Sequence, residues 1–343
     1  MTRYFIPKLM LTVTVFISLL SACAPATVLE PETPLQIKVG VIPFASNVIF
    51  QIAESEGYFE EQGLDVELVQ FKSTNEFIPL LLDGQIDVAQ PTLTAGFFNA
   101  IDRGGTIKIV LPATTIEEQE CTDVAYFVRK SDYEAGTFAE PSDWIGAKLA
   151  LSPAGAQSTS GYITDCFLQL GEVKLADVEL VSVDLAAQQE ALRTGQVDIV
   201  ITAEPWVVRM KEDMDLALLI EAESVTPGFT ISSVVYGAKL LNNADAGARF
   251  AAAYLKAARQ YAQGATSRNV EIVAEFTGLD AALVKKMCPA VIPVDGQINL
   301  DYVIDYQNWL IEQKLLDNLI APDKFIDTSV AENARGILEK VDQ

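Results

Sequence analysis

The sequence contains no histidine among its 343 residues. This absence excludes Ser-His and Cys-His nucleophilic catalysis and every metal site built on imidazole ligands. Cysteine is also scarce, since only four are present, and the spacing of Cys121, Cys166 and Cys288 matches no metal-binding motif. No glycine-rich cofactor loop is visible either. We therefore expect neither a metal site nor a cofactor.

Basic residues are few beside the acidic ones: 24 lysines and arginines against 47 aspartates and glutamates give a formal charge of −23. Such a surface repels nucleic acid and anionic lipid headgroups. Nucleic acid is therefore excluded as a partner, while the charge says little about a small ligand. The hydrophobic content of 50% is enough for a large core, and the length allows two lobes.

Long hydrophobic runs are absent apart from Leu9 to Leu20, which carries no charge. That run is shorter than the roughly 20 apolar residues that span a bilayer. Arg3 and Lys8 flank its start, and small residues lead from it to Cys23, as in a secretory signal. Residues 1–22 are therefore predicted to be a signal peptide. Its removal takes away two positive charges and no negative ones, which changes the formal charge from −23 to −25.

Cys23 ends the segment Leu-Ser-Ala-Cys, which resembles the lipobox of bacterial lipoproteins. In that motif the thiol takes a diacylglycerol and the cysteine becomes the new N-terminus, so we expect a lipid on Cys23 as the only membrane attachment. An ordinary signal peptide cut nearby is the alternative. Residues 23–35, rich in Pro, Ala and Thr, are expected to form an extended tether. The protein would lie on the outer face of the cell membrane or in the periplasm.

An exported protein can form disulfides. Besides Cys23, three thiols remain, and at least one of them stays unpaired. A bridge between Cys121 and Cys166 is one prediction, and three free buried thiols are the other.

Strands and helices alternate twice along the chain, which favours two mostly parallel sheets with helices on their faces. The predicted elements of the two series are strand 36–42, helix 48–56, strand 66–71, helix 76–82 and strand 86–90, and then strand 149–152, a helix ending near 170, strand 178–183, helix 186–193 and strand 197–201.

A short repeat connects the two series. Leu82–Val88 (LDGQIDV) parallels Arg193–Ile199 (RTGQVDI), and each reads as a helix end, a Gly cap, Gln, an aliphatic residue and Asp before a strand. Two similar corners arising by chance are the alternative. The equivalent places of the two copies favour two similar lobes and structural roles for Asp87 and Asp198.

The last third of the chain is predicted to be mostly helical. One further strand is predicted at 228–236, and helices are predicted at 244–263, 269–276, 281–287, 300–313 and 330–340.

Several segments, in this order along the chain, resemble a known family. They are Ala53–Phe59 (AESEGYF) with Gly63–Val66 (GLDV), the paired Gly-Gln-X-Asp units, Ala203–Trp206 (AEPW) and Trp309–Gln313 (WLIEQ). The chain resembles the type II periplasmic solute-binding proteins of ABC importers. Within them it resembles the branch of nitrate, sulfonate and taurine receptors and of thiamine-pyrimidine binding and synthesis proteins. The resemblance implies a small-molecule ligand, an importer permease as partner, and a monomer.

The resemblance also implies two αβ lobes joined by two crossing strands, which we place near Asp123–Val128 and Thr230–Tyr236. Lobe one would hold residues 36–125 and 231–343, and lobe two residues 126–230. The ligand would sit between the lobes, which would close over it by a hinge motion.

In open αβ sheets, ligands bind outside the carboxyl ends of the strands. Four loops of this kind are expected to line the cleft: 43–48, 90–96, 154–161 and 202–206. The third (AGAQSTSG) combines small residues with hydroxyls at a helix start, where backbone N–H groups can hold an acceptor; a simple Ser/Thr helix cap is its alternative. The ligand-binding residues predicted from these loops are Phe44, Asn47, Thr92, Gly155, Gln157, Ser158, Thr159, Glu204 and Trp206.

Asn47 lies where the thiamine-pyrimidine members carry an Asn-His pair, and here Val48 replaces the histidine. Because the synthesis members depend on that histidine, this chain is expected to bind and not to catalyse. A helix N-cap is the alternative role of Asn47. Glu204 would either accept hydrogen bonds from the ligand or cap the turn before Pro205.

Phe44 and Trp206, from opposite lobes, are expected to sandwich a flat ring, which would contribute roughly 0.5–1.5 kcal/mol for each aromatic pair. Tyr162 and Phe229 are further candidates for the pocket. The adjacent pair Phe97 and Phe98 is expected in the core.

The four loops contain no Lys, Arg or His. This predicts a neutral planar heterocycle, either riboflavin or a thiamine-pyrimidine precursor. A receptor for sulfonate, taurine or nitrate, held by helix N-termini, is the alternative. A membrane-tethered sensor is another, and an enzyme using Asp198 and Glu204 as acid and base is a third.

Overall fold

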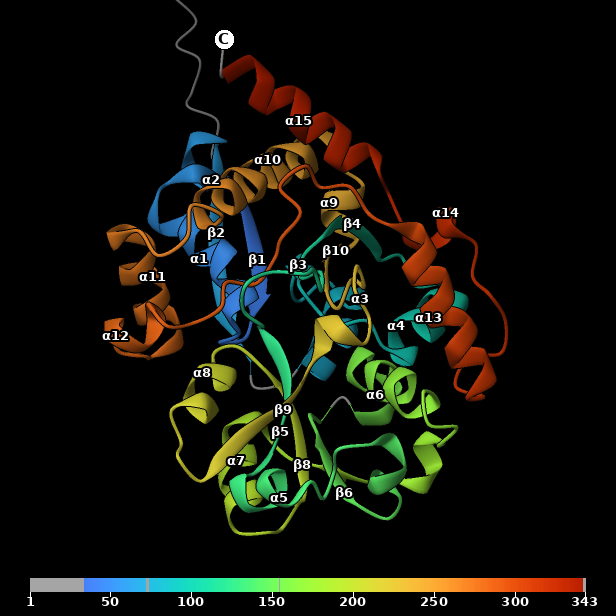
Figure 1. The fold of residues 1–343 in the computed structure, drawn as a ribbon. Helices are drawn as coiled ribbons and strands as arrows, with labels where there is room; N and C mark the ends of the chain where they lie inside the picture. Colours follow the sequence, from blue (N-terminus) through green and yellow to red (C-terminus); the bar gives the residue numbers. More distant parts are fainter. Residues whose placement is uncertain (1–33, 72–73, 154, 342–343) are drawn as a thin grey trace, which may run out of the picture. The chain divides into compact units, whose positions relative to one another are not determined.

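The computed structural model describes residues 34–71, 74–153 and 155–341. Cys23, the predicted signal peptide and nearly all of the predicted tether lie outside these residues. The described strands form two five-stranded sheets (Figure 1). The first sheet has the spatial order β2 (Leu64–Gln70), β1 (Leu35–Val41), β3 (Val88–Ala89), β10 (Ser233–Tyr236) and β4 (Lys108–Pro112). The second has the order β7 (Glu179–Ser182), β6 (Lys148–Leu151), β8 (Ile199–Ala203), β5 (Val124–Arg129) and β9 (Leu216–Glu221).

Each sheet contains one strand that runs against its neighbours. β10 pairs antiparallel with β3 and β4, and β5 pairs antiparallel with β8 and β9. The other pairs, β1 with β2 and β3 and β6 with β7 and β8, are parallel. The predicted fold class of two mixed, mostly parallel sheets with helices is therefore confirmed.

The helices fall into two groups, those on the side of the first sheet and those on the side of the second (Figure 1). Those of the first-sheet side are α1 (Val48–Ser55), α2 (Tyr58–Glu61), α3 (Phe77–Leu82), α4 (Ala95–Asp102), α9 (Ala238–Leu241), α10 (Ala244–Tyr261), α11 (Ser267–Thr277), α12 (Ala281–Val284), α13 (Leu300–Glu312), α14 (Pro322–Phe325) and α15 (Ser329–Val341). Those of the second-sheet side are α5 (Lys130–Ala135), α6 (Thr159–Gln169), α7 (Leu185–Arg193) and α8 (Trp206–Lys211).

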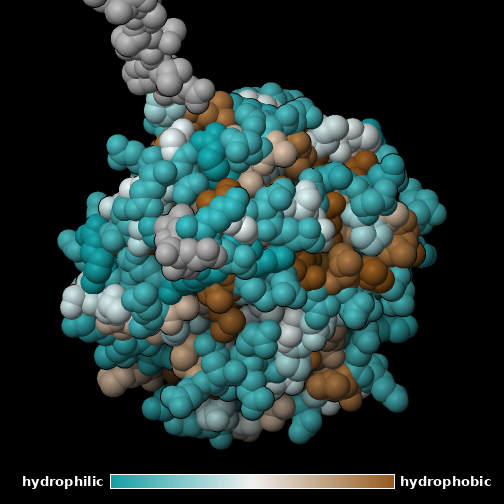
Figure 2. Space-filling view, turned by 90° about the horizontal axis from the view of Figure 1, so that it is seen from above, coloured by the Kyte–Doolittle hydropathy of each residue, from teal (hydrophilic) through white to brown (hydrophobic). Residues whose placement is uncertain are grey.

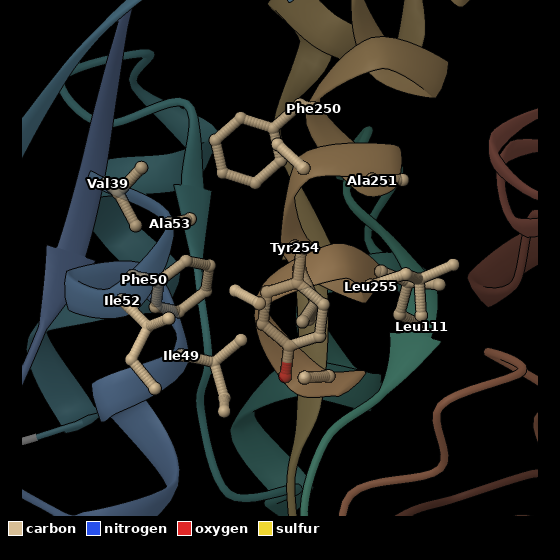
Figure 3. Packing of buried hydrophobic residues seen from close by; sticks show 14 of the residues in the cluster. Val39, Ile49, Phe50, Ile52, Ala53, Leu111, Phe250, Ala251, Tyr254 and Leu255 are labelled. Atoms are coloured by element: carbon tan, nitrogen blue, oxygen red, sulfur yellow. The ribbon is translucent and has the colours of Figure 1, made fainter. Parts of the chain in front are cut away.

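One face of the first sheet is covered by α1, α10 and α15. Successive strand residues point to opposite faces, so Val234 and Tyr236 join this core while Val235 joins another. Figure 3 shows α1 and α10 facing each other, with Phe50 close to Tyr254; the ring centroids are 5.2 Å apart. On the other side of α10, Ala251 and Leu255 face Leu111 of β4, and both are buried.

A second core is shared by the two sheets. It contains Ile109 and Val235 from the first sheet and Tyr126 and Leu149 from the second, all fully buried. α13 belongs to this core and lies beside α6, as Figure 1 shows. The two sheets are therefore held together by apolar packing as well as by the chain.

Two chain segments cross between the sheets, 113–123 after β4 and 222–232 after β9. Thr115 and Thr230 pair in an isolated antiparallel bridge, with their hydroxyl oxygens 3.5 Å apart. The crossings are therefore displaced from the predicted 123–128 and 230–236. Those two stretches are mainly β5 and β10, whose continuous apolar runs are buried on both faces inside the sheets.

The disulfide predictions are both wrong. Cys121 bonds to Cys288, with Cα atoms 5.7 Å apart and 167 residues between them in sequence. Cys166, on α6, is a free and half-buried thiol. The bond joins the first crossing segment to the loop that follows α12, a proximity that no local sequence pattern encodes.

The paired Gly-Gln-X-Asp corners have the same geometry in both sheets. The Asp87 carboxylate accepts the backbone N–H of Lys38 at 2.9 Å, and the Asp198 carboxylate accepts that of Lys148 at 3.0 Å. In each case the acid begins one parallel strand and holds its neighbour. The predicted structural role of both residues is confirmed.

Most predicted elements are present with boundaries that agree to within three residues, but one strand differs more. The strand predicted over 228–236 is limited to β10, because its first part belongs to a crossing segment. The sequence analysis does not predict the elements α2, α4, α5, α8, α9, α14, β4 and β9.

The surface seen from above is mainly hydrophilic with separate hydrophobic patches (Figure 2). Within the part of the chain that the structure describes, no helix has the length and apolar character needed to cross a membrane.

Candidate functional site

A cavity of about 100 Å³ lies between the two sheets. Most of its wall comes from the loops that follow the parallel strands β1, β3, β6 and β8. All four loops predicted from the sequence contribute. The rest of the wall comes from the two crossing segments, the start of α7, Ala290 and single residues of β5, β8 and α6. Parallel strands end here with their carboxyl ends, where αβ sheets bind ligands.

Asn47 braces the first loop and presents an amide group to the cavity. Its side chain is 2% exposed, and its Oδ1 accepts the backbone N–H of Ile42 at 3.2 Å. It occupies the N-cap position of α1, as the alternative predicted, but its side chain makes no cap bond to that helix. Its amide nitrogen has no hydrogen-bond partner among the described residues and remains free for a ligand.

Phe44, on the first-sheet side, and Trp206, on the second-sheet side, contact each other directly. They do not form the predicted sandwich around a ligand ring. Their ring centroids are 5.3 Å apart at an interplanar angle of 77°. This edge-to-face contact leaves no room for a third ring between them. Phe44 lines the cavity, whereas Trp206 starts α8 outside its wall.

A group of uncharged polar side chains forms the part of the cavity wall where β3 meets the two crossing segments. Gln90 Nε2 donates to Ser232 Oγ at 3.4 Å, and Ser232 Oγ donates to Thr114 Oγ1 at 3.1 Å. Thr92, predicted as a site residue, lines the cavity and pairs with Ser232 through the backbone. These residues join β3 to both crossing segments.

Glu204 lines the cavity but is occupied by the protein itself. Its Oε2 accepts the backbone N–H of Val208 at 3.0 Å, and its Oε1 accepts that of Cys288 at 3.1 Å. It therefore binds the first turn of α8, after Pro205 and not before it as predicted, and also links the second-sheet side to the loop that carries Cys288. Burial raises the pKa of Glu204 to about 7, while the two N–H donors and Lys211 oppose the shift.

Asp123, at the end of the first crossing segment, is the second acid in the wall. It is 6% exposed, and its carboxyl group accepts no hydrogen bond from any other described residue. Burial raises the pKa of Asp123 to about 7, and the nearby Glu223 and Glu204 add to the rise. Thr202, also in the wall, has a buried Oγ1 without a hydrogen-bond partner in the described structure.

The third loop contributes different residues from those predicted. Gly155, Gln157, Ser158 and Thr159 do not line the cavity, and Ser152, Pro153 and Ser160 do. Ser158 Oγ instead donates to the carbonyl of Gly155 at 2.7 Å within the turn that starts α6. Because the loop is drawn against Thr94 by an isolated bridge at Ser158, its predicted contact face is turned away from the cavity.

Gln157 lines a separate groove of about 270 Å³ together with Thr92 and Thr94. Its carbonyl oxygen lies 2.8 Å from the hydroxyl of Tyr306 on α13. The groove adjoins the cavity at Thr92.

Several contacts join the first-sheet side to the second-sheet side, some of them beside the cavity and some away from it. The backbone N–H of Ala45 donates to the carbonyl of Glu204 at 3.2 Å. Lys286 Nζ lies 2.9 Å from both carboxylate oxygens of Glu212. With the disulfide beside Glu204, these contacts define a closed arrangement of the site.

The other aromatic candidates do not reach the cavity. Phe97 and Phe98 are fully buried, as predicted for core residues. Tyr162 and Phe229 pack on each other with centroids 4.9 Å apart and contact Tyr306 between the two sides.

Sequence reasoning missed Gln90, Thr114, Asp123 and Ser232 as site residues. The sequence signal that could have identified them is a polar residue within or beside an apolar stretch. Asp123, for example, directly precedes the buried apolar run of β5. Their convergence depends on the crossing segments, which the sequence analysis placed several residues too far along the chain. Among the described residues, no group of three His, Cys, Asp or Glu side chains is placed to hold a metal ion.

Residues 30–277 match the NMT1-like family. No curated protein matches the sequence. Solved structures match over most of the chain. The periplasmic nitrate-binding protein NrtA from Synechocystis PCC 6803 has a TM-score of 0.74 at 13% identity, with 90% of each chain covered.

Two further structural neighbours are named for functions other than nitrate binding. The alkanesulfonate-binding protein SsuA from Xanthomonas axonopodis pv. citri, bound to MOPS, has a TM-score of 0.68 at 16% identity, covering 87% of this chain and 100% of its own. The desulfurization enzyme DSZB has a TM-score of 0.65 at 15% identity, covering 89% and 99%. At such identities these likenesses establish the fold alone, and they agree with the fold expected from the sequence.

Proposed function

The chain belongs to the NMT1-like family, and from that premise we propose that it is the solute-binding component of an ABC-type importer. The observation that carries the proposal is the cavity between two sheets, with walls supplied by both sides and by two crossing segments. Neighbours in the fold that are named as nitrate-binding and alkanesulfonate-binding proteins support the same interpretation. The partner would be the importer permease, and the binding protein would act as a monomer.

We propose that the ligand is a small sulfonate or related anion in preference to riboflavin. An engineered cavity of about 150 Å³ holds benzene, so a cavity of about 100 Å³ suits a ligand of that order and not a flavin. The contact between Phe44 and Trp206 also removes the stacking position that a flavin ring would need. The free amide of Asn47 and the hydroxyl of Thr202 would donate to sulfonate oxygens.

A thiamine-pyrimidine precursor is the second candidate, since it is small and carries N–H donors. The observation in its favour is that the described residues of the wall include Asp123 and Glu204 but no Lys or Arg. Carboxyl groups suit N–H donors better than they suit a simple anion such as nitrate.

Calorimetry of the purified protein with ethanesulfonate, taurine, MOPS, nitrate, riboflavin and 4-amino-5-hydroxymethyl-2-methylpyrimidine tests the proposal. We expect micromolar or tighter binding of at least one sulfonate, with the ligand recovered unchanged. Tight binding of riboflavin alone would reverse the order of ligands. Conversion of a bound sulfonate or sulfinate would favour an enzyme, the class in which the neighbour DSZB is named.

The two predicted lobes remain part of this proposal. Residues 36–125 with 231–343 would form one lobe and residues 126–230 the other, and ligand binding would favour their closure. Small-angle scattering with and without ligand measures this directly, because closure lowers the radius of gyration.

We also propose that Cys23 carries a lipid that anchors the protein at the outer face of the membrane. The support is the signal-like N-terminus and the Leu-Ser-Ala-Cys segment. Replacing Cys23 by Ser should move the protein from the membrane fraction to the soluble exported fraction and abolish labelling by a radioactive fatty acid. Unchanged membrane association of that variant would favour an uncleaved signal segment as the anchor.

A further inference from the structure

The cavity wall contains a carboxyl group that the protein leaves without a partner. Asp123 is 6% exposed and lines the cavity, and apart from its own backbone N–H, no described residue donates a hydrogen bond to it. Buried carboxylates in folded proteins are normally paired with a cation or satisfied by several donors. The missing partner of Asp123 is therefore a property of the site that needs an explanation.

The other acids nearby do not share this property. Glu204 accepts two backbone N–H groups, from Val208 and Cys288. Glu223 accepts the hydroxyl of Thr122 at 2.8 Å. Of the three acids, only Asp123 is both in the cavity wall and free of bonds to other described residues.

The charges that face Asp123 are negative. Glu204 and Glu223 both act on it as like charges. Lys211 lies near those two glutamates and outside the wall, and no lysine or arginine is among the described residues that line the cavity. The hydroxyl of Tyr261 is a neutral group nearby, and it accepts the N–H of Ala290. A simple anion entering this cavity would meet repulsion at Asp123.

Two other groups of the wall prefer an acceptor. The amide nitrogen of Asn47 is a free donor, and the buried Oγ1 of Thr202 has no partner among the described residues. The wall therefore presents donors and one unpaired carboxyl within a single small cavity. A ligand that satisfies all of them has an acceptor group and a positively charged or N–H-rich group on the same small skeleton.

We propose that Asp123 is a specificity-determining residue that binds a protonated nitrogen of the ligand. The ligand class is thereby narrowed to small molecules that carry an ammonium or protonated amidine group beside their acceptor group. This inference rests on the proposed solute-binding function and deepens it.

Taurine and isethionate form the matched pair of probes, because both are two-carbon sulfonates and differ only in an ammonium or a hydroxyl group. Calorimetry of the wild-type protein at pH 8 should show taurine binding roughly 10- to 100-fold more tightly than isethionate, the range of a charge-assisted hydrogen bond. In Asp123→Asn the preference should fall to about onefold. The ratio of the two constants does not depend on the fraction of folded protein.

Glu223→Gln is the control variant, since Glu223 lies near Asp123 but outside the cavity wall. It should keep the preference for taurine within about threefold of the wild type, because the ammonium contact itself is intact. A loss of preference in Glu223→Gln equal to that in Asp123→Asn would assign the effect to the general field of the acids and overturn the specific role of Asp123.

The pH dependence supplies a second readout. The ammonium of taurine stays protonated between pH 5.5 and 8, so a fall in taurine affinity toward pH 5.5 reports the protonation of a carboxyl group. The wild type should lose roughly tenfold in affinity over this range. Asp123→Asn should lose clearly less, and the remaining change belongs to Glu204 and Glu223.

Equal affinities of wild-type protein for taurine and isethionate would overturn the subsite while leaving sulfonate binding intact. If neither sulfonate binds, the same comparison applies to 4-amino-5-hydroxymethyl-2-methylpyrimidine and its 4-hydroxy analogue. A preference for the amino compound that Asp123→Asn removes would support the subsite even though the sulfonate assignment had failed. Absence of an amino preference in both pairs would refute the inference.

Discussion

The unpaired carboxyl group of Asp123, which we propose binds the ligand, lowers the stability of the protein without ligand. An unpaired buried carboxyl has a pKa of about 7, against 3.8 in its ordinary state. As the pH rises from about 4 to 7, the unfolded chain releases this proton before the folded protein does. The free energy of unfolding therefore falls over this window, and the contribution that is present below pH 4 is fully lost above pH 7.

Replacing Asp123 by Asn should remove this pH-dependent loss. We expect wild type and variant to unfold at similar urea concentrations at pH 4, and the variant to be more stable at pH 8, by on the order of 2–4 kcal/mol. Urea unfolding without ligand, followed by tryptophan fluorescence at both pH values, measures the difference. Burial raises the pKa of Glu204 in both proteins, and its like-charge repulsion with Asp123 is part of what the substitution removes. Parallel pH curves for the two proteins would contradict the prediction.

Asn47 and Glu204 illustrate what residue type alone can predict. Both are identifiable from the sequence because polar residues after a strand's carboxyl end tend to face a site. The hydrogen bonds of these side chains are not predictable. Asn47 accepts the backbone N–H of Ile42, five residues before it, and Glu204 accepts that of Cys288, 84 residues away. Local sequence indicates that a side chain needs a partner, but only the fold determines which partner it meets.

At the level of elements, the Gly-Gln-X-Asp corners behave as equivalent joints of the two sheets. Asp87 binds Lys239 Nζ at 3.0 Å in addition to its backbone bond, and Asp198 binds Arg129 at 2.9 Å. Lys239 follows the antiparallel strand β10, and Arg129 ends the antiparallel strand β5. Each acid therefore ties the odd strand of its sheet to a parallel pair.

Asp87→Ala and Asp198→Ala should each lower stability without affecting the ligand. The loss of a backbone bond and an ion pair predicts about 1–3 kcal/mol, and more at Asp87, whose side chain is 7% exposed against 29% for Asp198. Chemical denaturation measures the loss, and calorimetry of the folded variants should show unchanged affinity, because both residues lie at the amino ends of their strands. A selective loss of ligand affinity would instead favour the acid–base role considered for Asp198.

At the scale of the whole molecule, α13 is a helix of the C-terminal part that packs against α6 on the second-sheet side. Trp309 Nε1 donates to Asp165 at 2.8 Å, and the hydroxyl of Tyr306 lies 3.1 Å from the carbonyl of Leu93 and 2.8 Å from that of Gln157. Leu93 follows β3 and Gln157 precedes α6, so one hydroxyl contacts both sides of the cleft. These contacts favour the closed arrangement.

Tyr306→Phe should weaken closure while leaving the core packed. We expect faster ligand release, an affinity lower by roughly 3- to 10-fold, and a larger radius of gyration of the unliganded protein. Stopped-flow release and small-angle scattering are the measurements. Tyr302→Phe is the matched control, because its hydroxyl binds the Pro227 carbonyl within a crossing segment, at 3.0 Å. An effect of equal size in both variants would show that closure does not depend on the Tyr306 hydroxyl.

The sequence by itself determined the class of fold and the four loops that contribute to the cavity wall. Alternating strands and helices, a repeated corner and the polar loops after strands are local patterns, and hydrophobic periodicity and turn chemistry act over a few residues. The missing histidine likewise excludes whole classes of chemistry, because no arrangement of the other side chains supplies an imidazole. These conclusions need no knowledge of which distant segments meet.

Only the tertiary structure decided what depends on distant contacts. The partner of Cys121, the turning away of the third loop, the edge-to-face contact of Phe44 with Trp206 and the exposure of Asp123 to the cavity all arise where the two sides meet. Such contacts join residues far apart in the chain, and their geometry is set by the packing of whole elements and not by propensity. The ligand chemistry we infer therefore follows from the assembled wall, in which a polar residue of a crossing segment is left without a partner.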